Sequence, residues 1–380
     1  MADRRIGIIL NGATAQIAQR QHLGNVLVPI LGEGGLSLAG GDRAVPDILM
    51  VGRNESKLKQ VGEKFGLKNW TTDLDAALAN PDYTIYFDSS VTMGRESRLK
   101  KAIAAGKHIY TEKPIANSLD EARSVLKAAE AAEICHGVIT DKIFMPGFRK
   151  LKRILDSDSL GRIVSAKIEF GWWIFDGKDK PGQRPSWNYR KKYGGGLVLD
   201  MFPHWGYILN HLFGGVESIY CQTSTKIPER VDEDGNIFAV DVEDTANALL
   251  TLAGGVPAQL LTTWATRVRR DDVMTIHVDG TNGSAIASSH KCWTQSLENT
   301  SMPRLETEKG QHLNLFDAWT EEPDFEPFKH SFRYGWELYL RYVMEGGPFP
   351  FGLDQGVKAI EFIDAAYRSV EERRVIDIGD

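Results

Sequence analysis

The pattern of apolar and polar residues over the first 140 positions predicts strands and helices in alternation. Short apolar runs predict buried strands, and the amphipathic stretches between them predict helices. Asn54, Asp73 and Ser118 can each cap a helix N-terminus, and Gly106 ends a helix where a left-handed residue is favoured. Such alternation is typical of a parallel sheet with helices on both faces. The predicted strands are 6–10, 48–51, 84–87, 108–111 and 135–139, and the predicted helices are 16–31, 55–65, 74–79, 95–105 and 119–133.

The pattern changes after about residue 145, where the strands become longer and alternate apolar with polar residues. Half-exposed antiparallel strands have this pattern. A chain of 380 residues is also long for one domain. We therefore predict a doubly wound α/β domain at 1–145 and an α+β domain with a mixed sheet at 146–380. In the second domain we predict strands at 163–173, 217–225, 245–252, 258–264 and 273–279, and helices at 146–156, 197–213, 331–345 and 355–373.

Composition and charge exclude several classes of protein. The net charge is −6, and the 45 basic and 51 acidic residues are mixed along the chain, so a basic surface for nucleic acid is not expected. We find no apolar run of membrane-spanning length, and residues 1–10 lack the order of a signal peptide. The three cysteines are scattered and odd in number, which argues against a disulfide framework. These features predict a cytoplasmic protein that binds neither nucleic acid nor membrane.

The turn after the first predicted strand suggests dinucleotide binding. Its residues are Asn11, Gly12, Ala13 and Thr14, and the helix that follows offers backbone N–H groups to a pyrophosphate. Only Gly12 of the usual glycine fingerprint is present, and we predict a loop longer than usual, so an ordinary surface turn stays open as the alternative.

The second predicted main strand ends in Gly52, Arg53 and Asn54. An acidic residue at this place would bind the ribose hydroxyls of NAD, whereas a small residue followed by arginine suits the 2′-phosphate of NADP. We therefore favour NADP over NAD. The alternative is a solvated arginine at the end of a strand.

The strand at 108–111 leads directly into Glu112, Lys113 and Pro114. Proline ends the strand because it cannot continue the ladder, and it restricts the backbone of the preceding lysine. In a doubly wound sheet this lysine lies at the carboxyl edge, where ligands bind. There it can stabilise a developing alkoxide. A surface lysine in a turn is the alternative.

The stretch after Gly194–Gly196 places Asp200 and His204 one turn apart on a predicted helix. Their shared face is otherwise apolar, and a carboxylate beside an imidazole can act as a general base. A hydrogen-bonded core histidine is one alternative, and a metal site that adds His211 is another. Pro203 between them predicts a kink.

The loop at 184–196 contains Trp187, Asn188 and Tyr189. Aromatic and polar side chains in one loop are of the kind that packs on sugar rings. These aromatic residues fit a hydrophobic core equally well.

The order and spacing of these motifs resemble the Gfo/Idh/MocA family of oxidoreductases, from about residue 5 to residue 215. The resemblance rests on the first glycine turn, AAGKHIYTEKPIA and GGGLVLDMFPH. It implies a Rossmann domain joined to a domain with a large open sheet, and association into homodimers or homotetramers. The chain departs from the family where Ser90–Arg95 replaces a common Thr-Pro-Asn-x-x-His.

The resemblance also implies NAD(P)-dependent oxidation or reduction of a sugar, a polyol or a related ring. It assigns catalysis to Lys113, Asp200 and His204 and no metal. Cofactor contacts then include Ser89, Ser90, Thr92 and Glu112, and substrate contacts include Lys142.

Three other functions stay open. One is a redox-neutral hydrolase or lyase that oxidises a glycoside to a keto-intermediate and later returns the hydride, with no net NAD(P)H. The others are a non-catalytic sensor that binds NADP and a metal-dependent isomerase. The presence of Lys113, Asp200 and His204 together argues against the sensor.

Overall fold

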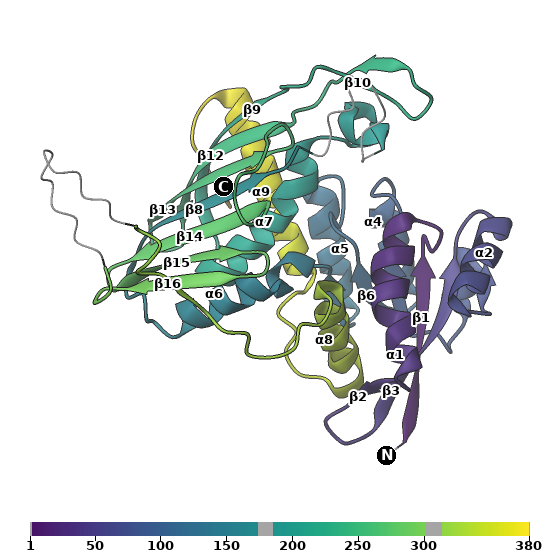
Figure 1. The fold of residues 1–380 in the computed structure, drawn as a ribbon. Helices are drawn as coiled ribbons and strands as arrows, with labels where there is room; N and C mark the ends of the chain where they lie inside the picture. Colours follow the sequence, from purple (N-terminus) through teal and green to yellow (C-terminus); the bar gives the residue numbers. More distant parts are fainter. Residues whose placement is uncertain (1, 174–184, 301–313, 380) are drawn as a thin grey trace, which may run out of the picture. The chain divides into compact units, whose positions relative to one another are not determined.

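The computed structural model describes residues 2–173, 185–300 and 314–379, which form two compact units (Figure 1). Unit 1 comprises residues 1–144 and 329–360, and unit 2 comprises residues 145–328 and 361–380.

Unit 1 is built on a seven-stranded sheet with the order β2-β3-β1-β5-β6-β7, and β4 pairs with β3. All of its pairings are parallel except that of β2 with β3. This arrangement confirms the predicted doubly wound α/β fold. The strands are β1 (Asp3–Asn11), β2 (Leu36–Ser37), β3 (Arg43–Val51), β4 (Trp70–Thr71), β5 (Ile85–Asp88), β6 (His108–Thr111) and β7 (His136–Val138). The helices from the first segment of the chain are η1 (Ala18–Leu27), α1 (Val28–Gly32), α2 (Glu55–Phe65), α3 (Leu74–Ala79), α4 (Arg95–Ala104), α5 (Leu119–Ala131) and η2 (Asp141–Phe144).

The predicted caps of three helices are confirmed. Asn54 accepts a hydrogen bond from the backbone of Lys57, and Asp73 accepts one from Ala76, each at 2.9 Å. Ser118 accepts one from Glu121 at 3.3 Å. A cap of this kind satisfies one of the backbone N–H groups that a helix start leaves unpaired.

The first predicted helix starts at residue 16, in agreement with the structure. Strand β1 ends at Asn11 and helical backbone begins at Gln16, so the turn between them contains four residues, 12–15. The helix that follows is wound as a π-helix over Ala18–Leu27. A π-helix holds more residues per turn than an α-helix.

Residues 329–360 pack with unit 1, although the sequence placed them in the second domain. They include α8 (Ser331–Glu345) and the start of α9 (Leu353–Glu372). The rings of Tyr110 and Tyr339 stack at 4.3 Å, and Trp336 meets Tyr110 edge-on at 4.9 Å. The backbone N–H of Val138 on edge strand β7 donates to the carbonyl of Phe351 at 2.9 Å. Aromatic burial and pairing of the sheet edge therefore tie this late segment to the first sheet.

Unit 2 is built on a nine-stranded mixed sheet with the order β17-β16-β15-β14-β8-β13-β12-β9-β18, in which only β8 and β13 pair in parallel. Helices α6 (Pro146–Asp156) and α7 (Leu197–Phe213) lie on one face of this sheet (Figure 1). The strands are β8 (Ile163–Gly171), β9 (Val216–Ser224), β12 (Thr245–Leu252), β13 (Val256–Thr263), β14 (Met274–Gly280), β15 (Gly283–Ser288), β16 (Cys292–Ser296), β17 (Thr320–Glu321) and β18 (Ile376–Asp377). A separate hairpin joins β10 (Glu229–Val231) and β11 (Ile237–Ala239).

The opposite face of the nine-stranded sheet is exposed in unit 2 itself. Along β12 and β13, Leu250 and Leu260 are buried, whereas their neighbours Leu249 and Gln259 are exposed. This face is mixed in character, because Leu249 lies between polar side chains of the same and adjacent strands. Within the described part of the chain, every helix is too short or too polar to span a bilayer.

Candidate functional site

The predicted cofactor residues of unit 1 lie in loops that follow parallel strands, so they gather at one edge of the sheet. These loops follow β1, β3, β5 and β6. Gly12 has a φ of +80°, and a Cβ at this position would lie 2.7 Å from the backbone nitrogen of Ser90. A Cβ on Gly52 would lie 3.6 Å from the side chain of Thr14. The first three loops are therefore in contact, and the close approach of the loop after β5 requires glycine at 12.

The helix after the first turn begins at the carboxyl edge with its backbone N–H groups available to an anion. The N–H groups of Gly12 and Ala13 already donate to the carbonyl of Val51 at 3.0 and 3.1 Å. The donors for a pyrophosphate are therefore those of Thr14 and the first helical residues. This donor set fits a dinucleotide.

Several predicted cofactor residues use their side chains to hold loops together. Asn11 donates to the hydroxyl of Tyr86 at 3.0 Å, and the hydroxyl of Ser89 donates to the Asn11 carbonyl at 3.0 Å. Asn54 caps α2. Arg53 is exposed and forms no ion pair with any described residue. Of this group, Arg53 keeps its charged side chain available to a ligand.

A buried acidic residue that the sequence reasoning missed organises the loop after β5. Asp88 accepts hydrogen bonds from the hydroxyls of Tyr86 (2.8 Å) and Ser90 (2.6 Å) and from the guanidinium of Arg98 (3.0 Å). Burial raises the pKa of Asp88, but the charges of Arg95 and Arg98 and the bonds from Ser90 and Arg98 outweigh it and lower that pKa overall. Thr92, also predicted to contact the cofactor, accepts the backbone N–H of Arg95 through its carbonyl at 2.9 Å.

Arg95 stands where the family often has histidine, and it joins two loops. Its side chain is 2% exposed, and it donates to the carbonyls of Ser90, Glu112 and Pro114. It also lies 3.5 Å from the carboxylate of Asp88. The replacement therefore links the loop after β5 to the turn at 112–114. Its position in the altered motif was the only signal in the sequence.

The Glu112-Lys113-Pro114 turn is fixed from several directions. Its Lys113–Pro114 peptide bond is cis. The Glu112 carboxylate accepts the backbone N–H of Lys113 at 3.2 Å and lies 2.7 Å from Nε2 of His22. Lys113 itself is half-buried. Lys142, which was predicted to contact the substrate, forms an ion pair with Asp141 at 2.6 Å, so its charge is partly neutralised.

In unit 2, Asp200 and His204 lie on α7, and each is at least half-buried. They are one turn apart, as predicted, and Pro203 lies inside this continuous helix. The Glu243 carboxylate accepts a hydrogen bond from the backbone N–H of Val198 at 2.8 Å, and this bond caps the start of α7.

The glycines before α7 approach the protein's own chain. A Cβ on Gly195 would lie 2.4 Å from the carbonyl of Asn188, and one on Gly196 would lie 2.8 Å from the carboxylate of Glu243. Both glycines are therefore required by packing in unit 2. Their close contacts give no sign that they approach a ligand.

The predicted aromatic loop divides into buried and exposed residues, and Arg184 at its start lies outside the described residues. Trp187 is 48% exposed, whereas Asn188 and Tyr189 are buried. The buried guanidinium of Arg230 lies 4.2 Å from the Tyr189 ring, and Trp264 meets the same ring edge-on at 5.9 Å. Trp187 and Tyr193, which is 53% exposed, are therefore the aromatic side chains of this loop that are accessible.

No cluster of three or more histidine, cysteine, aspartate or glutamate residues suited to a metal occurs among the described residues. Asp200, His204 and His211 are not gathered into such a cluster in the described structure.

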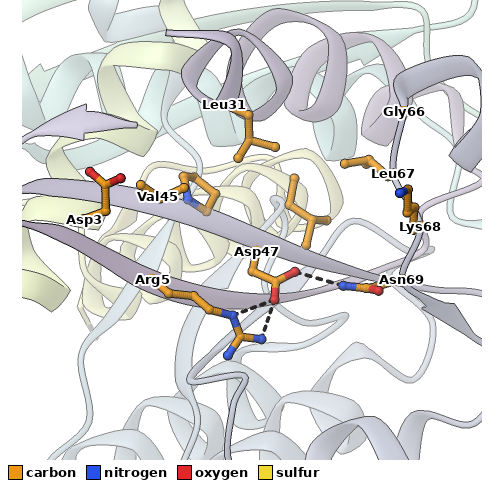
Figure 2. Close-up of a pocket in the computed structure, with 11 residues that line it drawn as sticks. Asp3, Arg5, Leu31, Val45, Asp47, Gly66, Leu67, Lys68 and Asn69 are labelled. Carbon is orange, nitrogen blue, oxygen red and sulfur yellow. Dashed lines mark hydrogen bonds and ion pairs between the residues drawn. The ribbon is translucent and has the colours of Figure 1, made fainter. Parts of the chain in front are cut away.

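A hollow of about 370 Å³ lies at the other end of β1 and β3, along Asp3, Arg5 and Asp47 (Figure 2). Figure 2 shows Arg5 and Asn69 both pointing to the Asp47 carboxylate, with bonds of 2.7 and 3.0 Å. These groups satisfy one another, and the hollow is remote from the carboxyl edge that binds ligands in this fold. We assign it a structural role.

Comparison with known proteins supports an oxidoreductase. Residues 47–139 match the oxidoreductase family with an NAD-binding Rossmann fold, and residues 148–286 match the GFO/IDH/MocA C-terminal domain. D-xylose dehydrogenase of Paenarthrobacter nicotinovorans is 39% identical over 379 residues, which covers 99% of this chain and 98% of that protein. Levoglucosan dehydrogenase of Pseudarthrobacter phenanthrenivorans is 26% identical over 252 residues, or 61% and 62% of the two chains.

The fold is also shared with solved structures. Levoglucosan dehydrogenase in complex with NADH and levoglucosan superimposes with a TM-score of 0.82 at 18% identity, and the match covers 99% of this chain and 100% of that one. The two matched domains and the full-length relative agree with the motifs described above. The chain therefore belongs to the GFO/IDH/MocA family of NAD-binding oxidoreductases.

Proposed function

We propose that this protein is an NAD(P)-dependent dehydrogenase that transfers hydride between the nicotinamide and a secondary alcohol or ketone of a sugar or related polyol. The observation that carries the proposal is the 39% identity to D-xylose dehydrogenase over almost the whole chain. A pentose is accordingly the first substrate to test. Lys113, Asp200 and His204 supply the acid–base and electrostatic groups that this reaction needs.

The residue roles follow from their chemistry and from the family motif. His204 accepts the proton of the substrate hydroxyl during oxidation, and Asp200, one helical turn away, orients the imidazole and stabilises its charged form. Lys113 stabilises negative charge on the same substrate oxygen. The nicotinamide, when bound, supplies the hydride chemistry. The further proposed substrate contacts are Lys142, Trp187, Asn188 and Tyr189.

The cofactor proposal favours NADP over NAD. Gly52 gives no carboxylate to the adenosine ribose, and the exposed guanidinium of Arg53 can pair with a 2′-phosphate. We also propose a homodimer or homotetramer, in which a second copy covers the exposed face of the nine-stranded sheet around Leu249. Sedimentation velocity at micromolar concentration tests this point, and a purely monomeric species would contradict it.

A substrate screen tests the proposed activity. D-xylose, other pentoses, hexoses, inositols, levoglucosan and glycosides are incubated with NAD and with NADP, and formation of the reduced cofactor is followed by absorbance. Consumption of a glycoside without net reduced cofactor would indicate the redox-neutral hydrolase or lyase. Cofactor binding without turnover of any substrate would indicate the sensor.

Variants then test the residue roles. Lys113→Met should lower kcat by about 100-fold or more, and His204→Ala should remove most activity, with Asp200→Asn intermediate. Oxidation should accelerate with pH through the range in which a histidine titrates, because the base must be unprotonated. Lys101→Met is the control, since Lys101 pairs with Asp75 at the surface of unit 1. Wild-type turnover in Lys113→Met, or an unchanged pH step in His204→Ala, would refute the corresponding role.

A further inference from the structure

A buried chain of hydrogen bonds reaches the Glu112-Lys113-Pro114 turn from two distant parts of the sequence. His22 in η1 is fully buried. Its Nδ1 lies 3.0 Å from the indole nitrogen of Trp336 in α8, and its Nε2 lies 2.7 Å from a carboxylate oxygen of Glu112. All of these residues belong to unit 1.

The donors and acceptors in this chain have a single consistent direction. An indole N–H can only donate, so Nδ1 of His22 must be the acceptor. The proton of the neutral imidazole is then on Nε2, which donates to Glu112. An imidazolium carries protons on both nitrogens and would set two donors against each other at Nδ1. The geometry therefore specifies the neutral Nε2–H tautomer, with bonds running from Trp336 through His22 to Glu112.

The carboxylate of Glu112 connects this chain of hydrogen bonds to the backbone of Lys113. One oxygen is held by His22, and the other accepts the backbone N–H of Lys113. Burial raises the pKa of Glu112, but the hydrogen bond from His22 is the largest of several opposing contributions, which together outweigh burial and lower that pKa overall. The carboxylate is therefore ionised at neutral pH and accepts both bonds.

We infer that Trp336 and His22 are positioning residues for Lys113: the indole N–H keeps Nδ1 of His22 unprotonated, His22 fixes the Glu112 carboxylate, and that carboxylate fixes the backbone of Lys113. The inference rests on the proposed role of Lys113 in the reaction. Neither residue touches the reacting atoms in this scheme. A small displacement of the lysine is enough to slow a reaction that depends on its placement.

Trp336→Phe tests the first bond. Phenylalanine retains an aromatic ring beside Phe87 and Tyr110, whose ring centroids each lie 4.9 Å from that of Trp336, but it cannot donate to His22. We expect kcat to fall by about tenfold, while KM for the cofactor changes by less than about twofold. Phe332→Leu is the matched control, because Phe332 touches the His22 ring edge-on at 5.2 Å without a hydrogen bond.

Variants at residue 22 test the second bond. His22→Gln offers an amide N–H to Glu112 and should recover part of the kcat that is lost in His22→Leu. Equal loss in the two variants would mean that volume, and not donation to Glu112, sets the effect.

A double-mutant cycle separates positioning from a general structural effect. If Trp336 acts through Lys113, the loss caused by Trp336→Phe should disappear in a Lys113→Met background. If the two losses multiply instead, the inference is wrong. A wild-type kcat in Lys113→Met refutes the proposed role of Lys113, whereas an impaired Lys113→Met with a fully active Trp336→Phe refutes only this inference.

Nitrogen NMR of the histidine-labelled protein gives a readout that does not depend on activity. The His22 signals are identified by their absence in His22→Gln. The wild-type protein at neutral pH should show His22 protonated at Nε2 alone. Trp336→Phe should show a larger fraction of His22 protonated on both nitrogens, because Nδ1 then faces no donor while the Glu112 carboxylate still holds a proton on Nε2. An imidazolium, or a proton on Nδ1 in the wild-type protein, would overturn the inference.

Discussion

Replacing Arg95 by methionine tests how the altered motif after β5 supports the turn that carries Lys113. The guanidinium donates to the carbonyls of Ser90, Glu112 and Pro114 and is almost completely buried. Methionine has similar length but no donor. Three bonds from a charged donor, at about 1.5–3 kcal/mol each, set an upper limit of about 9 kcal/mol for the loss of stability.

The expected cost is nearer the lower end of this range. Breaking a buried ion pair typically costs about 3–5 kcal/mol. Asp88, however, keeps Arg98, Ser90 and Tyr86 as donors. We therefore expect Arg95→Met to lower the free energy of unfolding by about 3–5 kcal/mol in total, which a domain of ordinary stability survives. The kcat should also fall, by about ten- to a hundredfold, because the carbonyls on both sides of Lys113 lose their donor.

Arg98→Met is the matched control. Arg98 also makes three contacts, to Asp88 and to the carbonyls of Val91 and Met93, but its side chain is 23% exposed. Water can replace its bonds to the two exposed carbonyls but not its bond to the buried Asp88, so we expect a loss of about 1–3 kcal/mol, smaller than in Arg95→Met, and little change in kcat. Urea unfolding and steady-state kinetics of the two variants give the comparison. Equal losses of stability, or a kcat that is unchanged in Arg95→Met, would refute the reasoning.

Three further predictions concern stability and cofactor choice. Burial raises the pKa of Glu243 in the folded protein despite its hydrogen bonds. The contribution of the protonated Glu243 to the free energy of unfolding is therefore complete below the unfolded pKa near 4.5, and it is lost as the pH rises through the higher folded pKa. Glu243→Gln should therefore flatten the pH dependence of thermal unfolding above about pH 4.5, and an unchanged profile would contradict this. Gly52→Asp should weaken NADP binding and strengthen NAD binding in fluorescence titrations. The fold should tolerate this change, since a Cβ at residue 52 needs only a shift of a few tenths of an ångström by the Leu58 side chain. Arg53→Ala should weaken NADP binding alone, and no response in either variant would exclude contact with the 2′-phosphate. Gly12→Ala should destabilise the protein by about 2 kcal/mol or more, because its φ of +80° disfavours a side chain, and a smaller loss in urea unfolding would show that the loop after β5 can move away.

The sequence predicted those helices and strands that are set by residues close together in the chain. The helix over 55–65 and its Asn54 cap agree with the structure, because the cap and the amphipathic period are written in adjacent residues. Strands β15 and β16 were missed, since their short segments are rich in glycine, serine and threonine and lack a clear apolar run. The short β10–β11 hairpin was missed for a similar reason.

The site was predictable only where motifs carry it. Glu112-Lys113-Pro114 is contiguous, so the sequence indicated it directly. His22 and Trp336 had no signal, because their meeting depends on contacts between residues 314 positions apart. The π-helical winding of η1 was not predicted, because nothing in the sequence marks it.

The composition of unit 1 from two chain segments has a consequence for the nascent protein. When residues 1–144 have left the ribosome, the aromatic faces of Phe87 and Tyr110 still lack Trp336 and Tyr339, which are synthesised much later. The first unit therefore cannot mature before residues 145–328 of the second unit have been translated, in contrast to the usual order in which the N-terminal domain folds first. Until then its incomplete aromatic surface is a natural target for chaperones. For the same reason, a gene fragment that ends after residue 144 should yield an aggregating product, whereas one that joins 1–144 to 329–360 contains every segment of the unit.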